Sequence, residues 1–285
     1  MGTEGINYRS MTFSDIDGGL RLTRAAHWNQ LRRDWEMFLG QSPDGCRVAV
    51  RNGIVIGTSA TIRYQDCFSW IGMVLVDPEE RGRGVGTELM RQALQVLADQ
   101  RCVRLDATPA GEPLYRKLGF EEECRLSRMQ AVISGPVPEG RTTVRPVEEN
   151  DFQSIALFDR KTFGADRCFL LRWMWAGAPE YAWIAADASG IQGYIFGRHG
   201  YNFEHLGPIA ASSVEVARDL VSACLPRLVG KPVIVDATGY VPDWREWLSS
   251  VGFQEQRPFI RMYRGEEPLI AEASRQFAVL GPEFG

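Results

Sequence analysis

The segment from Val76 to Gly86, with sequence VDPEERGRGVG, combines the residue types that bind an anionic ligand. Glycines at positions 82, 84 and 86 let the backbone approach a ligand without a Cβ in the way, and Arg81 and Arg83 add positive charge. A Walker loop would end in Gly-Lys-Ser/Thr, and a dinucleotide-binding loop would place its glycines as G-x-G-x-x-G. Neither pattern is present, so the segment predicts a phosphate or diphosphate site of another kind.

The elements on either side of this segment would hold it in place. Before it, the apolar run from Ile71 to Val76 is rich in β-branched residues and predicts a buried strand. After it, apolar residues recur at helical spacing from Thr87 onward. The first turn of a helix carries unpaired N–H groups and the positive end of the helix dipole, which attract an anion. The sequence therefore predicts a strand, a glycine-rich loop and a helix whose N-terminus faces a diphosphate.

The full pattern V-x-P-x-x-R-G-x-G-x-G resembles the acyl-CoA loop of the GCN5-related N-acetyltransferases (GNAT), whose core pattern is Q/R-x-x-G-x-G/A. The resemblance implies acetyl-CoA as co-substrate and no metal. In the family, the strand before the loop offers backbone groups to the pantetheine and the thioester. The cofactor-binding residues that the resemblance implies are Val74, Leu75, Val76, Arg81, Gly82, Arg83, Gly84, Val85, Gly86 and Thr87.

The same resemblance implies that Tyr115, in the sequence PLYRKLGF, protonates the departing thiolate. A phenol can do this without a metal, although a tyrosine packed beside Phe120 is the alternative interpretation. Where the family often has asparagine and alanine before this tyrosine, the chain has Thr108 and Gly111. The strand before the loop also lacks the glutamate that many members use as a base. A water chain, a base from elsewhere or an acceptor that arrives neutral would then be required.

Candidate residues for contacting the acceptor come from both halves of the chain. In the first half, Trp28, Asn29 and Asp34 lie where the family pattern overhangs the acceptor, although they also fit a polar surface beside a half-buried tryptophan pair. In the second half, Asp159, Asp166 and His205 suggest an acidic pocket between the domains that binds a cationic small molecule. A solvated ion pair and a structural histidine are the alternatives for these three residues.

The chain predicts two copies of one fold. GFEEECRLSRM at Gly119 recurs as GFQEQRPFIRM at Gly252, and three further matches follow the same order at similar offsets. The predicted class is α/β (α+β), with two tandem GNAT folds that each have a mixed central sheet flanked by helices. We expect domains at residues 1–134 and 142–285, joined by a linker at 135–141. The second copy has Ala210-Ala211-Ser212-Ser213 where the glycine loop would lie, so one cofactor per chain is expected.

Composition excludes several classes of function. The net charge of −4 and the absence of a basic stripe argue against nucleic acid. No apolar run has the length of a membrane span, and the first residues lack the pattern of a secretory signal. The six cysteines are scattered and are expected to be free thiols. These features predict a cytoplasmic protein without membrane or nucleic-acid partners, either a monomer or a homodimer.

The leading functional prediction is an acetyl-CoA-dependent N-acetyltransferase that acts on a primary amine of a small molecule by direct attack in a ternary complex. No cysteine lies in the motif to suggest a covalent relay. Acetylation of protein lysines or N-termini is an alternative and would need an open groove. A CoA-binding sensor or scaffold without turnover is the alternative from another class.

Overall fold

The structure is a computed structural model that describes residues 5–65, 67–134 and 144–285. The predicted linker at 135–141 lies outside the described residues. The first half of the chain contains the elements in the predicted order: β1 (Ile6–Ser10), α1 (Ile16–Ala25), α2 (Arg32–Gln41), β2 (Arg47–Arg51), β3 (Ile54–Tyr64), β4 (Phe68–Val76), α3 (Val85–Val96), β5 (Cys102–Ala107), α4 (Glu112–Lys117) and β6 (Glu121–Val132).

The second half repeats this order: β7 (Val144–Pro146), α5 (Phe152–Phe163), α6 (Cys168–Gly177), β8 (Trp183–Asp187), β9 (Gly190–Arg198), β10 (Glu204–Ala211), α7 (Val214–Cys224), β11 (Pro232–Thr238), α8 (Pro242–Ser250) and β12 (Gln254–Gly265). One more strand, β13 (Gln276–Ala278), follows without a counterpart in the first half. The predicted fold class, two tandem α/β copies with helices flanking a mixed sheet, is confirmed.

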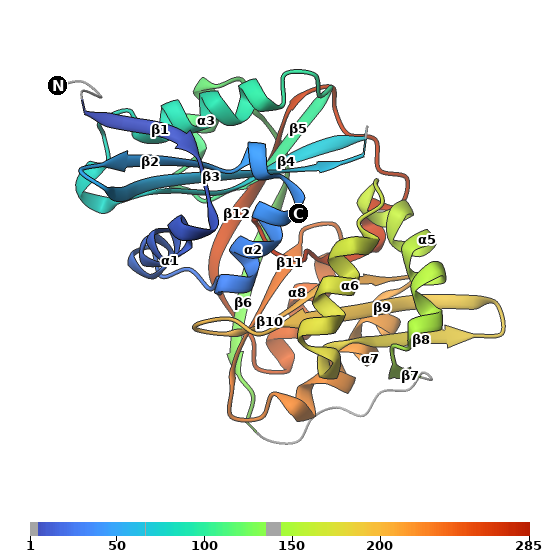
Figure 1. The fold of residues 1–285 in the computed structure, drawn as a ribbon. Helices are drawn as coiled ribbons and strands as arrows, with labels where there is room; N and C mark the ends of the chain where they lie inside the picture. The colour runs from blue at the N-terminus through green and yellow to red at the C-terminus, as the bar shows by residue number, and fades with distance from the viewer. Residues whose placement is uncertain (1–4, 66, 135–143) are drawn as a thin grey trace.

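The strands form one continuous sheet, because the two halves exchange their last strands. The order across the described strands is β1-β2-β3-β4-β5-β12-β6-β11-β13-β10-β9-β8-β7. β12 of the second half therefore pairs with β5 of the first half, and β6 of the first half pairs with β11 of the second. β6 and β12 pair with each other and run side by side through the centre of the molecule (Figure 1).

The largest hydrophobic core is shared by the two halves. Side chains of α1 and α2 and side chains of α5 and α6 belong to one cluster of buried residues. The Tyr64 ring lies edge-on to Phe163 from the other half, with ring centroids 4.9 Å apart. Burial of apolar area is the main stabilising contribution to folding. A core that draws on both halves indicates that neither half completes its fold alone.

Neighbouring strands diverge at one place in each half. β4 and β5 pair in parallel only at Ser69–Val103 and Trp70–Arg104, and beyond that point they separate. In the second half, β10 and β11 pair over Glu204–Leu206 and then separate in the same way. There β13 occupies the gap and pairs with both strands. The cleft of the second half is thus filled by the chain's own tail.

Candidate active site

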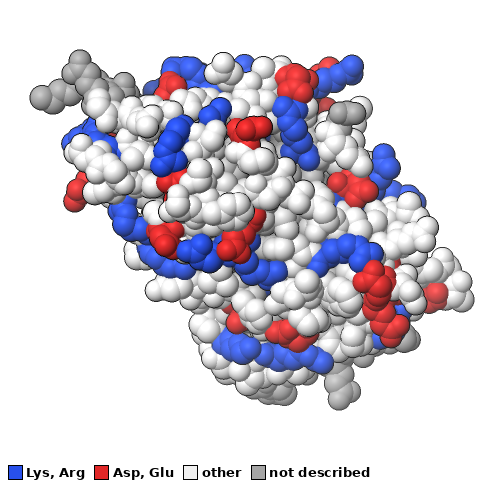
Figure 2. Space-filling view, viewed as in Figure 1, with Lys and Arg blue, Asp and Glu red and all other residues white. Residues whose placement is uncertain are grey.

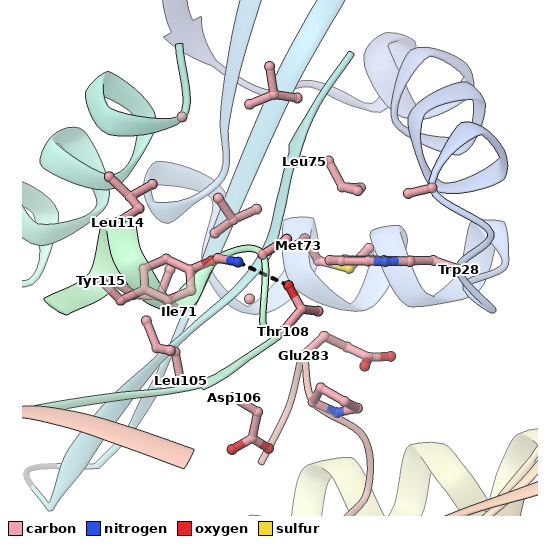
Figure 3. Close-up of a pocket in the computed structure, with 18 of the residues that line it drawn as sticks. Trp28, Ile71, Met73, Leu75, Leu105, Asp106, Thr108, Leu114, Tyr115 and Glu283 are labelled. Atoms are coloured by element: carbon pink, nitrogen blue, oxygen red, sulfur yellow. Dashed lines mark hydrogen bonds between the residues drawn. The ribbon is translucent and has the colours of Figure 1, made fainter. Parts of the chain in front are cut away.

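The gap between β4 and β5 opens into a cavity of about 890 Å³. Residues 71–76 form one wall, and Leu105, Asp106 and Thr108 form the opposite wall. Leu114 and Tyr115 face it from α4, Trp28 closes the other side, and Glu283 enters from the tail (Figure 3). The cavity therefore draws on both halves of the chain.

The glycine-rich loop forms one end of this cavity, and its backbone requires glycine. Gly82 and Gly84 have φ angles of 74° and 85°, in the left-handed region that other residues rarely adopt. A Cβ at either position would meet no atom within 4 Å, so the loop faces open space. Gly84 is the N-cap of α3, which places the start of that helix at the cavity. This geometry fits an anion held by helix N–H groups.

The charged side chains of the loop have different roles. Arg81 lines the cavity, and its Nε donates to the Val76 carbonyl at 3.3 Å. Arg83 is absent from the lining and pairs with Glu80 at 3.2 Å. Glu80 lines the cavity but also accepts from Arg51 at 2.7 Å. Because two arginines neutralise Glu80, its charge does little to oppose an anion in the cavity.

A β-bulge interrupts β4 in the middle of the cavity wall. Thr58 pairs with Leu75 and Ala60 pairs with Gly72, so two residues of β4 oppose one residue of β3. Met73 has a φ of 54°, and its carbonyl accepts from Thr58 Oγ1 at 2.8 Å. Bulges turn backbone groups away from the regular ladder and are common beside active sites. Here the bulge frees backbone of β4 to face the cleft.

Tyr115 lies on α4 with its side chain nearly buried against the cavity. Burial raises its pKa to about 12, so the phenol stays protonated at neutral pH. A Cβ on Gly111 would come within 2.9 Å of the Tyr115 ring. The glycine at this departure from the family pattern is therefore what leaves room for the ring. Thr108 Oγ1 accepts from the Gly111 amide at 3.3 Å (Figure 3).

The opposite end of the cavity carries four charged side chains that sequence reasoning missed. Asp106 is held by Arg261 at 2.8 and 2.9 Å, and Arg128 is paired with Asp236 at 2.7 Å. The Glu283 carboxylate accepts from Arg198 and lies in the tail, which has no repeat counterpart. Arg257 completes the set. The repeated DAT and RM segments contain Asp106, Asp236, Arg128 and Arg261, and this was the available signal.

The structure brings only some predicted acceptor residues to the cavity. Trp28 and Asn29 line it. The Asn29 amide is engaged by the second half, since Oδ1 accepts from the amides of Asn202 and Phe203 at 2.9 Å and Nδ2 donates to the Phe203 carbonyl. The loop at 28–30 is thus tied to the β9–β10 connection. Asn29 works there as an anchor between the halves.

Four other predicted acceptor residues lie outside the cavity lining. Asp34 accepts from the Leu31 amide and from Arg198, both at 2.6 Å. Asp166 accepts from the Cys168 amide at the start of α6. These contacts give both carboxylates a local structural role. Asp34 is connected to the cavity through Arg198, which also holds Glu283.

Asp159 and His205 are completely enclosed by protein. Asp159 pairs with Arg167 at 2.9 Å and accepts from the Tyr194 hydroxyl. His205 Nε2 lies 3.1 Å from Asp236, and burial lowers the histidine pKa. Neither side chain lines the cavity.

Two further classes of site are absent from the described residues. No group of three or more His, Cys, Asp and Glu side chains among them could hold a metal ion. None of the helices in the described ranges has the length and apolar character needed to cross a bilayer. On the face drawn in Figure 2, acidic and basic side chains are interspersed without a broad patch of one sign.

The family follows from this geometry and from comparison with known proteins. Residues 14–120 match the family described as Acetyltransferase (GNAT) family, and residues 155–278 match the Acetyltransferase (GNAT) domain. The chain therefore belongs to the GNAT family of acetyltransferases and contains two GNAT domains. It is a transferase in which the two GNAT domains lie in tandem.

Individual relatives agree with this assignment. The chain is 28% identical to holothin acyltransferase from Pseudoalteromonas sp. (strain SANK 73390), over 86% of this chain and 83% of the relative. A solved structure from Pyrococcus horikoshii superposes with a TM-score of 0.82 at 23% identity, covering 99% of this chain and 96% of that one. A tandem GNAT protein from the clavulanic acid biosynthesis pathway has a TM-score of 0.67 at 13% identity, covering 93% and 99%. These two structures share the fold.

Proposed function

We propose that this protein is an acetyl-CoA-dependent N-acetyltransferase that transfers an acetyl group to a primary amine of a small molecule. The observation that carries the proposal is a cavity with the glycine-rich loop at one end, Tyr115 beside it and charged side chains at the other end. A cofactor and an acceptor can then meet in one cleft. Direct attack in a ternary complex needs this arrangement.

The position of each residue along the cavity suggests its role in the reaction. The loop from Arg81 to Thr87 would hold the diphosphate of acetyl-CoA, and residues 74–76 would contact the pantetheine and orient the thioester. Acetyl-CoA supplies the activated acetyl group when bound. Tyr115 would protonate the thiolate as it leaves, because its raised pKa keeps the proton available at neutral pH.

The second half and the tail support a small acceptor. Pro282 and Glu283 line the acceptor end, and the loop at 28–30 is anchored to the second half by Asn29. A protein lysine would require an open groove at this place. The relative named as an acyltransferase of holothin is consistent with a small acceptor.

The experiment follows acetyl-CoA consumption and acetylated product by mass spectrometry over a panel of small amines and peptides. Wild type is compared with Arg81→Ala and Tyr115→Phe, and Arg91→Ala is the matched control because Arg91 is an exposed arginine of α3 that pairs with Glu88 outside the cavity lining. Turnover of small amines that falls in the first two variants and persists in the control supports the proposal. Turnover of peptides alone would establish a protein acetyltransferase, and acetyl-CoA binding without any product would establish a sensor.

A further inference from the structure

Arg257 occupies a distinctive position at the acceptor end of the cavity. Its side chain lines the main cavity and also a second cavity of about 580 Å³, whose other lining residues include His27, Asn202 and Gln256. Arg257 is the one lining residue that these two cavities share. A molecule that reaches the cleft from this side would meet the guanidinium.

The surroundings of Arg257 compensate its charge only in part. In the β12–β6 ladder, Arg257 lies directly opposite Arg128, and like charges at paired positions of a ladder destabilise a sheet. Asp236 neutralises Arg128 through two hydrogen bonds of 2.7 Å. Within the described residues Arg257 has no ion pair of its own, and its buried Nε has no hydrogen-bond partner. Its guanidinium stacks toward the Phe259 ring, 5.0 Å from the centroid.

The electrostatics agree with this geometry. Burial, followed by repulsion from Arg128, lowers the pKa of Arg257 to about 10, and attraction from Asp236 and Glu283 offsets only part of the effect. A half-buried arginine whose buried Nε has no acceptor is costly unless a ligand provides one. Since a planar guanidinium matches a carboxylate in a two-point contact, a carboxylate is the ligand group that would satisfy it.

The charge near Glu283 is negative, opposite in sign to the charge of Arg257. Arg198 serves two carboxylates, Glu283 and Asp34, so this cluster holds one more acidic group than basic groups. The backbone of Glu283 lies against Gly72 of β4, where a Cβ would come within 2.4 Å of the Glu283 carbonyl oxygen. Glu283 is therefore next to the bulged strand of the cleft, and Arg257 is at its outer end.

We propose that the acceptor is an amino acid-like molecule whose carboxylate pairs with Arg257 and whose amine lies beside Glu283. This inference rests on the proposed acetyl transfer and adds the chemical class of the acceptor. A molecule with opposite charges at its two ends matches the opposite charges at the two ends of the acceptor site. The binding energy at Arg257 would hold the amine in line with the cleft.

The test compares carboxylic acids with their uncharged analogues. The probes are α-amino acids and ω-amino acids of increasing chain length, each with its methyl ester, and kcat/KM is corrected for the fraction of neutral amine. The variants are Arg257→Gln and, as the matched control, Arg125→Gln, which removes an exposed arginine of β6 that pairs with Glu122. Calorimetry measures binding of acids and esters to the CoA-loaded protein, independently of turnover.

We expect the acids to be preferred over their esters in the wild type, with one chain length favoured. In Arg257→Gln the KM for the acids should rise about tenfold or more, as for loss of one partner of a charge pair, while the values for esters stay unchanged. Acetyl-CoA affinity should be the same in all three proteins.

Different outcomes overturn one proposal or the other. Acetylation of acids and esters with equal efficiency, or acids that are unaffected by Arg257→Gln, would overturn the carboxylate subsite and leave acetyl transfer standing. If neither series is acetylated but other small amines are, the amino acid-like acceptor is overturned and acetyl transfer stands. If no amine is acetylated, the proposed function fails and calorimetry decides the subsite. Acids that then bind no more tightly than their esters would overturn it as well.

Discussion

Asp106 of the first half is paired with Arg261 of the second half through two hydrogen bonds of 2.8 and 2.9 Å. The repeat-related residues form the reciprocal pair, Asp236 with Arg128. Each aspartate lies near the end of a diverging strand of its own half, β5 or β11, and each arginine lies on the last strand of the other half. The exchange of β6 and β12 is thus fixed by two buried ion pairs with the same geometry.

Removing one partner of such a pair should be strongly destabilising. Asp236 is completely buried and lies outside the cavity lining, so Asp236→Asn tests stability apart from ligand contacts. We expect a loss of about 3–5 kcal/mol in the free energy of unfolding, because Arg128 is left as an uncompensated buried charge. Urea unfolding measures it.

The control for this variant is Asp99→Asn at the exposed Arg63–Asp99 pair, which also has two hydrogen bonds. A surface pair of this kind contributes little to the free energy of unfolding. An equal decrease in the free energy of unfolding in the two variants would show that the buried pair between the halves stabilises the fold no more than a surface pair does.

Separate expression of the two predicted domains tests the consequence of the exchange. Fragment 1–134 contains β5 and β6 but lacks β12, which lies between them, and fragment 142–285 lacks β6 beside β11. We expect each fragment alone to give little cooperative unfolding and the two expressed together to form a stable complex. Circular dichroism and size-exclusion chromatography report the result. Two fragments that fold independently would contradict the shared core.

The sequence predicted the order of elements in both halves but could not predict which strand pairs with which. GFEEECRLSRM and GFQEQRPFIRM are so alike that either strand fits beside β5 or β11 by hydrophobic pattern. The choice depends on the tertiary contacts of Asp106 and Asp236, which no local pattern encodes. The cavity position of the loop from Arg81 to Thr87 was predictable because glycine spacing encodes backbone conformation directly.

The tail was the least predictable part of the site. β13 and the residues after it have no repeat counterpart, and their role depends on the gap between β10 and β11. Trp70 Nε1 donates to the Pro282 carbonyl at 3.0 Å, and Phe284 stacks on Phe38 with ring centroids 4.7 Å apart. These contacts join residues that are more than half the chain apart in sequence. Asp159 and Asp166 were predicted to contact the acceptor, but both are engaged within their own half, Asp159 by Arg167 and Asp166 by the Cys168 amide.

Gly72→Ala tests the contact between the tail and β4. The new Cβ would lie 2.4 Å from the Glu283 carbonyl oxygen, and backbone atoms cannot yield at low cost. We expect a lower melting temperature and a raised acceptor KM because Glu283 is displaced.

Gly40→Ala is the matched control for this variant. Gly40 lies in α2, and a Cβ added there would have no atom within 4 Å, so alanine should stabilise that helix by about 0.5–1 kcal/mol. If Gly72→Ala behaves like Gly40→Ala in both assays, the tail is not held where the structure has it.

Tyr115→Phe separates acid catalysis from binding. The variant keeps the ring that packs 6.1 Å from Phe120 and removes the hydroxyl. We expect kcat to fall about a hundredfold, within the usual range for loss of a general acid, with acetyl-CoA affinity unchanged. Tyr263→Phe, at a tyrosine outside the cavity lining, should leave kcat unchanged.

The pH dependence of kcat in the wild type tests whether Tyr115 stays protonated at neutral and moderately alkaline pH. A group with a raised pKa stays protonated until pH approaches that value, so the acid should remain competent up to roughly pH 11. A fall in kcat between pH 8 and 10 that is absent in Tyr115→Phe would mean that the phenol titrates near its ordinary value, about 10.

The carboxylates at the acceptor end are poorly suited to deprotonate the acceptor amine. Attraction from Arg198 and a hydrogen bond from Gln30 outweigh burial and hold the pKa of Glu283 below its usual range, so this carboxylate is ionised at neutral pH and is a weak base. Burial raises the pKa of Asp106, but both of its carboxylate oxygens are held by Arg261, at 2.8 and 2.9 Å. We therefore expect kcat/KM to rise with pH until it reaches the pKa of the acceptor amine itself. When the pH profile is measured with two acceptors whose amines differ in pKa, the pH at which kcat/KM stops rising should shift with the pKa of the amine. A break at the same pH for both acceptors would instead reveal a base on the protein, and its loss in Glu283→Gln would assign that base to the tail.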